Sequence, residues 1–216
     1  MKRNLLVVFC MIFAISLAFG QKTDKEMKKE LNDKAVKEAQ KQAKQFTKEG
    51  WKVYPGSLPM DKQIEQSQMK LIAVDENGKP RYITADGNAV AETKSAVESQ
   101  AVELGKLQLA GMIETNIASI VNANLANTQA STSEATSVTE VVQSSKNIIA
   151  QQLGFVDPAF KLYRDLKDKK VEVQVRLFYE TTQSLVIAKK ALRKELKEKL
   201  KKTDEEVNKL LETPAK

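Results

Sequence analysis

Two sets of side chains have the types and spacing that hydrolytic chemistry uses. Ser67 and Lys70 have the S-x-x-K spacing, in which a lysine activates a serine nucleophile. Neither S-D-N nor K-T-G accompanies it, and so short a pattern arises by chance in a lysine-rich chain. The second set is carboxylates on one predicted helix, which could form an acid–base pair for glycoside hydrolysis: Glu92, Glu98, Glu103 and Glu114. On an amphipathic helix such residues are usually only the solvated face.

Other chemistries are excluded by residue type. The chain has no histidine, so it cannot form a Ser-His-Asp triad or an imidazole metal site. Its one cysteine, Cys10, falls in a segment that we expect to be removed, which leaves no thiol for a disulfide, zinc site or nucleophile. No Gly-rich phosphate loop occurs, and Asp75 to Gly78 lacks the ligand spacing of an EF-hand. We expect a non-enzymatic protein without cofactor or metal; a carboxylate hydrolase is the enzymatic alternative.

The first twenty residues have the pattern of a secretory signal peptide. Lys2 and Arg3 precede an apolar run over residues 5–17, and small residues then predict cleavage between Gly20 and Gln21. The alternative is a membrane anchor, for which the run is short. Because Gln21 is not a cysteine, lipidation there is excluded. The sequence thus predicts a periplasmic or secreted protein with no integral membrane span after cleavage.

The elements at the N-terminal end are a helix and a hairpin. Apolar spacing predicts a helix over residues 24–49, which forms an arm at 21–50. A short strand at 51–54 and a helix near 59–66 follow. Met69 to Val74 is predicted as a strand, turned by a type I′ turn at Asn77-Gly78 into a strand at 81–84 that ends at Ala85 to Asn88.

A long central helix is predicted from residue 91 to about 123, with Gly105 and Gly111 allowing close approach of neighbouring elements. Residues 122–137 are rich in Asn, Ser and Thr and are predicted to be a loop. Ser137 and Glu140 have capping-box spacing, which favours a helix ending at Gly154; the Val and Thr content of 138–142 leaves a strand as the alternative there.

The last part of the chain gives the clearest strand. Apolar and polar residues alternate over 171–179, after a strand near 160–166 and a turn at 167–170. A basic amphipathic helix then follows within 181–216. The predicted fold is α+β: a small antiparallel sheet built from two hairpins within residues 51–180, packed by a long central helix, with helical arms at both ends.

Three aromatic residues of the predicted sheet region are candidates for a ligand-facing surface: Trp51, Tyr54 and Tyr82. Trp51 is the only tryptophan, and it favours a core anchor where the helical arm meets the sheet over a ligand-stacking role. A small-molecule or glycan binder that uses this sheet face is the alternative function.

The C-terminal helix has a basic cluster that could bind an anionic envelope surface or an acidic protein: Lys189, Lys190, Arg193, Lys194, Lys197 and Lys201. Lys199, Lys202, Glu195 and Glu198 lie among them, and a merely solubilising helix face with Glu–Lys pairs is the competing interpretation. The formal net charge is +7. Nucleic acid is not an expected partner, because the chain is predicted to be exported and no aromatic residues interleave with the charges.

Two stretches together resemble a known family. The helix pattern over Ala96 to Ile113, with small residues before "LAGMI", and the strand over 171–179 are similar to the Lpp-twenty type of bacterial envelope lipoprotein domain. Gly50-Trp51-Lys52-Val53 with Pro55-Gly56-Ser57-Leu58-Pro59 resembles secreted Bacteroidetes proteins of unknown function. The chain lacks the lipid-bearing cysteine of the lipoproteins. The resemblance implies an envelope role and a small α+β fold, and it supplies no catalytic residues.

Overall fold

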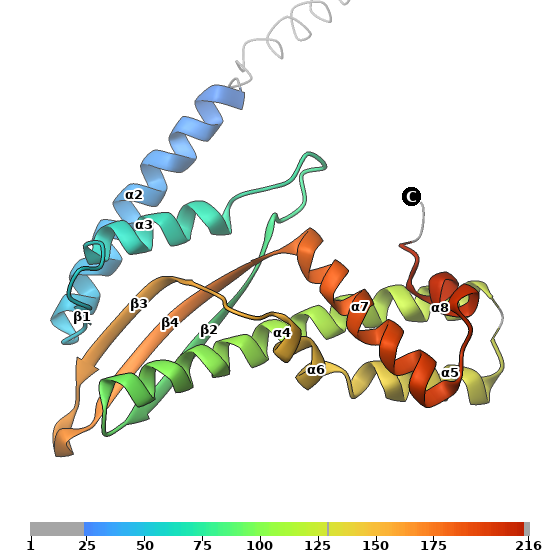
Figure 1. Cartoon of the computed structure of the whole chain (residues 1–216). Helices are drawn as coiled ribbons and strands as arrows, with labels where there is room; N and C mark the ends of the chain where they lie inside the picture. The colour runs from blue at the N-terminus through green and yellow to red at the C-terminus, as the bar shows by residue number, and fades with distance from the viewer. Residues whose placement is uncertain (1–23, 129, 214–216) are drawn as a thin grey trace, which may run out of the picture.

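The fold is α+β, as the sequence predicts. A computed structural model describes residues 24–128 and 130–213, and the predicted signal peptide with its Gly20–Gln21 cleavage site lies outside them. A four-stranded antiparallel sheet has the order β1-β3-β4-β2 (Figure 1). Its strands are β1 (Lys52–Val53), β2 (Tyr82–Ala91), β3 (Pro158–Asp165) and β4 (Val171–Glu180).

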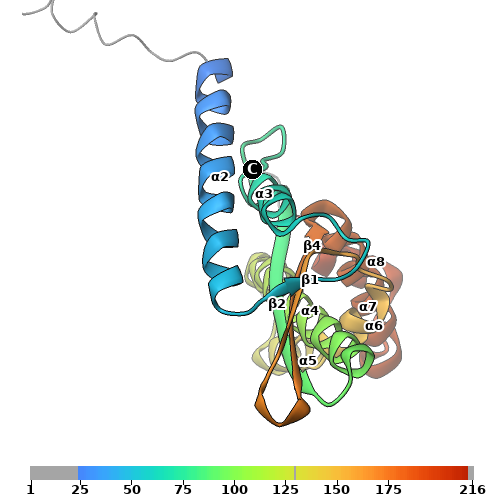
Figure 2. The ribbon, with the colours of Figure 1, turned by 90° about the vertical axis from the view of Figure 1, so that its left-hand side faces the viewer.

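The helices divide into two groups around the sheet. The long helix α4 crosses one face of the sheet and continues into a group of helices beyond it (Figure 1). Helices α2 and α3 lie on the other side (Figure 2). The helices are α2 (Asp24–Lys48), α3 (Met60–Leu71), α4 (Lys94–Asn127), α5 (Thr132–Gln143), α6 (Lys146–Gln152), α7 (Thr181–Leu200) and α8 (Asp204–Leu211). None of the helices within the described ranges is long and apolar enough to span a membrane.

The main core lies between the inner face of the sheet and α4, and it continues into the helical group. Alternate residues of β4, from Val171 to Leu177, are buried against α4, which confirms the predicted alternation. Leu109, Ile113 and Ile117 of α4 are fully buried in the same core. Helix α7 adds Leu192 and Leu196, so the C-terminal helix is anchored in the main core.

Strand β2 corrects the prediction that the chain breaks at residues 85–88. It runs through Gly87 to Ala91 and pairs with β4 along its whole length. A Cβ atom on Gly87 would lie 1.9 Å from the backbone oxygen of Ala101, so glycine is required where α4 crosses the strand. Gly105 meets Leu177 and Gly87 at the same crossing, which confirms the predicted close approach.

The predicted strand over Met69 to Val74 is wrong for its first half. Residues 69–71 end helix α3, and only an isolated bridge joins Val74 to Pro80. In the turn between them the Asp75 carboxylate accepts hydrogen bonds from the backbone N–H groups of Asn77 and Lys79, each 2.9 Å long. Of the turn residues only Gly78 has a positive φ, so the turn is not type I′.

The loop predicted over residues 122–137 is mostly helical. Helix α4 continues to Asn127, and α5 begins after Ser131, whose hydroxyl accepts a hydrogen bond from the backbone N–H of Glu134. Ser131 is therefore the N-cap, and Ser137 lies within α5 and donates to the Ser133 carbonyl. The strand alternative for 138–142 is also wrong. The hydroxyls of Thr136 and Ser137 donate to carbonyls one turn earlier, so these polar groups are satisfied within the helix.

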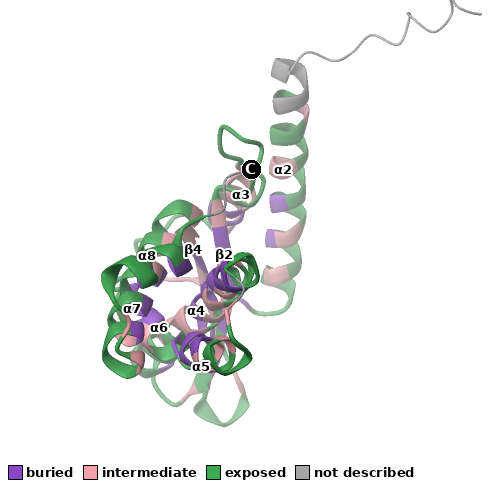
Figure 3. Cartoon of the chain, turned by 90° about the vertical axis from the view of Figure 1, so that its right-hand side faces the viewer, coloured by how far each residue is buried: buried purple, intermediate pink, exposed green. Residues whose placement is uncertain are grey.

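A second, smaller core joins α2 and α3 to the outer face of the sheet. It contains Ala39 and Ala43 of α2, Trp51, Ile64 of α3 and two residues of β3, Phe160 and Leu162. Among the side chains of α2 within residues 29–48, only Ala39 and Ala43 are buried; Phe46 is partly buried against this core, and most of the others are exposed (Figure 3). Leu31 is 49% exposed, because α2 extends past the elements that could cover it (Figure 1).

Candidate interaction surface

The three aromatic candidates do not share one surface. Trp51 is 5% exposed and belongs to the second core. Its ring meets Phe46 edge-on, with centroids 6.2 Å apart, and the Arg164 guanidinium lies 4.6 Å from the ring centroid. Trp51 thus occupies the position of a core anchor, and its ring is covered by protein groups.

Tyr54 and Tyr82 lie on opposite faces of the sheet region. Tyr54 packs against Tyr163 with centroids 4.9 Å apart, and Lys161 lies over its ring. Burial of the Tyr54 hydroxyl, helped by the nearby Glu98 carboxylate, raises the pKa of Tyr54 to about 12. Tyr82 instead meets Phe178 edge-on, and Lys70 is 5.8 Å from the Tyr82 centroid.

The hydrolytic candidates are not brought together. Glu98 pairs with Lys161 at 2.7 Å, and Glu103 pairs with Lys106 at 3.1 Å. Burial raises the pKa of Glu114, but no second candidate carboxylate is paired with it. The Ser67 hydroxyl is buried without a hydrogen-bond partner among the described residues. Within those residues no group of three or more Asp, Glu, His or Cys side chains could hold a metal.

A polar row on the outer face of the sheet was not recognised from the sequence. Arg176 forms a bidentate pair with Asp86, at 2.6 and 2.7 Å, and this pair raises the pKa of Arg176. Arg164 donates to Glu172 at 2.6 Å, and Asn88 donates to the same carboxylate at 3.0 Å. These charges satisfy one another and join the strands, so they do not form an open binding site. The pairing depends on strand register, although the alternation over 171–179 did place Glu172 and Arg176 on one face.

Half of the basic cluster of α7 forms hydrogen bonds with other parts of the protein, and the other half is exposed to solvent. Three of its members reach α8 or the short segment that follows it: Lys189 donates to Thr213 at 2.9 Å, Arg193 to Asn208 at 2.7 Å, and Lys197 to Asp204 at 2.9 Å. The other three point to solvent and form no ion pair in the described chain: Lys190, Lys194 and Lys201.

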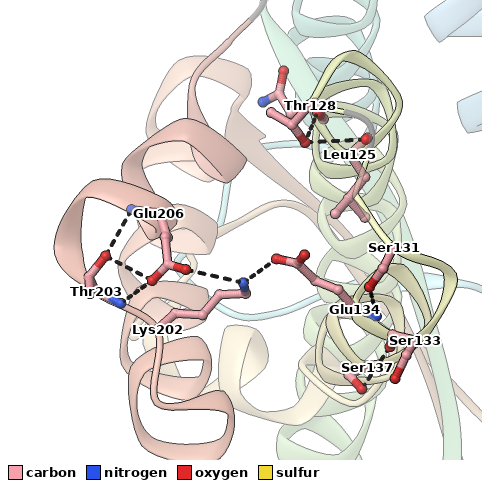
Figure 4. Close-up of polar contacts among 10 residues, drawn as sticks. Leu125, Thr128, Ser131, Ser133, Glu134, Ser137, Lys202, Thr203 and Glu206 are labelled. Carbon is pink, nitrogen blue, oxygen red and sulfur yellow. Dashed lines mark hydrogen bonds and ion pairs between the residues drawn. The ribbon is translucent and has the colours of Figure 1, made fainter.

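Lys202, which follows this cluster, is paired with acidic residues. Lys202 has a side chain only 9% exposed, and its ammonium lies between the carboxylates of Glu134 and Glu206 (Figure 4). Glu206 also accepts hydrogen bonds from the backbone and hydroxyl of Thr203, which forms a capping box at the start of α8. Acids of α5 and α8 therefore pair with Lys197 and Lys202, while Lys190, Lys194 and Lys201 stay exposed without an ion pair in the described chain.

Helix α2 carries a second basic surface, the α2 stripe, which consists of Lys37, Lys41, Lys44 and Lys48. Their 4-3-4 spacing keeps them within an arc of about 60° and along about 16 Å of helix. This arc is opposite the face that buries Ala39 and Ala43. All four are exposed, and none forms an ion pair with another described residue.

The charge of this part of α2 is not balanced locally. Residues 37–48 contain four lysines and one glutamate, a net charge of +3. The acid nearest in sequence beyond them, Glu49, accepts a hydrogen bond from Gln45. The stripe was not recognised from the sequence, where only the apolar spacing of residues 24–49 was used. The signal that could have revealed it was the regular spacing with few acids between.

Comparison of the chain with protein-family models, with curated proteins and with solved structures found no match.

Proposed function

We propose that this protein is an exported, non-enzymatic interaction module of the cell envelope, in the periplasm or outside the cell, and that α2 is its binding element. The observation that carries the proposal is the contrast in charge pairing. Arg164 and Arg176 of the sheet face pair with acids, and so do four lysines of the α7–α8 region, Lys197, Lys199, Lys202 and Lys209. The α2 stripe, in contrast, is a continuous row of four lysines in which none pairs with a described acid. Unmatched charges on an outlying helix are available to a partner.

Two features support the envelope role. The N-terminal segment has the pattern of a signal peptide, and the chain resembles envelope lipoprotein domains over residues 96–113 and 171–179. The glycan-binding alternative has less support, because the ring of Trp51 is covered by Phe46 and Arg164. The hydrolase alternative also has less support, since Glu98 and Glu103 each pair with a lysine.

A photo-crosslinking residue placed in the native cell tests the proposal. Substituted at Lys41, within the α2 stripe, it should give stable adducts in the envelope fraction. The same residue at Lys190, an exposed position of α7, is the matched control and should give few. Retention of the uncleaved chain in the cytoplasm, or equal adducts from both positions, would overturn the proposal.

A further inference from the structure

We infer that the α2 stripe docks on the headgroups of an anionic lipid bilayer. This inference rests on the proposed function, in which α2 is the binding element. The charge complementarity is direct: four unpaired ammonium groups and a local net charge of +3 face outward. Phosphate headgroups of a bilayer present the opposite charge over a continuous surface.

The residue type of the stripe indicates that its partner is an extended charged surface and not a single small anion. The stripe contains only lysine, a flexible point charge, and no arginine, whose planar group recognises single phosphates or carboxylates with fixed geometry. The four side chains are spread over about 16 Å of one helix face, so they do not converge on a single anion. No aromatic residue lies within the stripe, so the contact is electrostatic and peripheral.

The shape of the molecule allows a flat surface to reach the stripe. Helix α2 forms one edge of the molecule, and all the other helices and strands lie to one side of it (Figure 2). Ala39 and Ala43 pack with residues of α3 and β3 in the second core, and helical spacing puts the stripe on the opposite face of α2. A plane that touches the stripe therefore meets α2 before any other helix or strand.

The expected size of the effect follows from the charge. A lysine near an anionic membrane contributes about fivefold to binding at moderate ionic strength, so losing four should weaken binding roughly several-hundredfold. Salt screens such a contact over about 8 Å at physiological ionic strength. Binding that depends on the stripe must therefore weaken steeply as salt is added.

The test is vesicle sedimentation of the chain from Gln21 onward, which retains every described residue. Vesicles of phosphatidylcholine mixed with phosphatidylglycerol are compared with phosphatidylcholine alone. The stripe variant carries Lys37→Gln, Lys41→Gln, Lys44→Gln and Lys48→Gln. The matched control carries Lys167→Gln, Lys170→Gln, Lys190→Gln and Lys194→Gln, which change the net charge equally at exposed positions outside α2. Circular dichroism checks that both variants remain folded.

The wild type and the control should bind the anionic vesicles, and the stripe variant should not; neutral vesicles should bind none of them. Equal losses in both variants would assign the binding to net charge and overturn the inference. So would vesicle binding by the stripe variant at the wild-type level. If no vesicles bind but position 41 crosslinks to an acidic protein, the lipid inference fails and the proposed function stands. If neither is seen, both fail.

Discussion

Helices α2 and α7 each present lysines on the face opposite a row of small or apolar buried residues. In α7 the buried row includes Ala188, Leu192 and Leu196, all in the main core. In α2 it is Ala39 and Ala43, in the smaller second core. The two helices differ in what surrounds their charges, since α7 has α5 and α8 beside it and α2 has mainly α3.

The difference teaches that a run of basic residues does not by itself indicate a binding surface. The longer basic run, in α7, meets acids of α8 through Lys197 and Asp204, and Lys202 reaches Glu134 of α5. The shorter stripe of α2 meets none. Whether a lysine is paired with an acid therefore depends on which helices and strands lie beside it, and these are known only from the folded structure.

The largest expected effect is a difference in unfolding free energy between substitutions in α7 and in α2. Leu196→Ala opens a cavity at a fully buried position of α7 and should cost about 2–5 kcal/mol of unfolding free energy. Urea unfolding followed by far-UV circular dichroism measures it. Leu31→Ala, at a half-exposed position of α2, is the control and should cost less than about 0.5 kcal/mol. Equal costs would show that α2 is as deeply anchored as α7.

A change on the buried face of α2 should be smaller and local. Ala39 is 1% exposed, so Ala39→Leu overfills the second core and should cost about 1–3 kcal/mol there. Trp51 is the only tryptophan and lies in that core, so its fluorescence reports the loss selectively. Gln40→Leu, at an exposed neighbouring position, should leave the fluorescence transition in place. If the dichroism transition shifts equally, the two cores unfold as one unit.

The charge pairing itself gives a smaller effect. Lys202→Met leaves Glu134 without its partner at a site where the lysine side chain is 9% exposed, and it should cost about 1 kcal/mol. Lys44→Met removes an unpaired charge and should change stability by less than about 0.5 kcal/mol. Thermal unfolding of both variants measures the contrast. A loss of stability for Lys44→Met as large as that for Lys202→Met would mean that Lys44 is paired with an acid of the protein.

The smallest effect concerns pH at the start of α8. Hydrogen bonds from Thr203 lower the pKa of Glu206 below its usual value. A lowered pKa in the folded state gives stability that is complete above the ordinary glutamate pKa and is lost as pH falls through the lowered value. Amide exchange of α8 should therefore quicken at acid pH, and Glu206→Gln should remove part of that dependence. Exchange that is equally pH-dependent in the variant would exclude Glu206 as the cause.

Sequence patterns predicted the parts of the fold whose order is local. The helix of α4 and the β3–β4 hairpin followed from periodicity, because each buries a continuous face. The course of β2 through Gly87 could not be predicted, since glycine there serves the crossing of α4 and is not a turn.

The candidate site was less predictable. The charge run of α7 stood out in the sequence, but the Arg176–Asp86 pair depends on strands far apart in the chain. The stripe of α2 can be recognised only when its unpaired lysines are compared with the ion pairs that the folded chain forms elsewhere.

The strand order β1-β3-β4-β2 also sets the order in which the molecule can assemble. Ala91 pairs with Val171, and the rest of β2 pairs with residues still further along the chain. The β3–β4 hairpin can form locally, whereas joining β2 to β4 closes a segment that contains α4, α5 and α6 and therefore costs more chain entropy. Such long-range pairing slows folding, whereas helices form from local contacts. Refolding should therefore be limited by sheet closure, with α4 formed early and the edge strand β2 joining late.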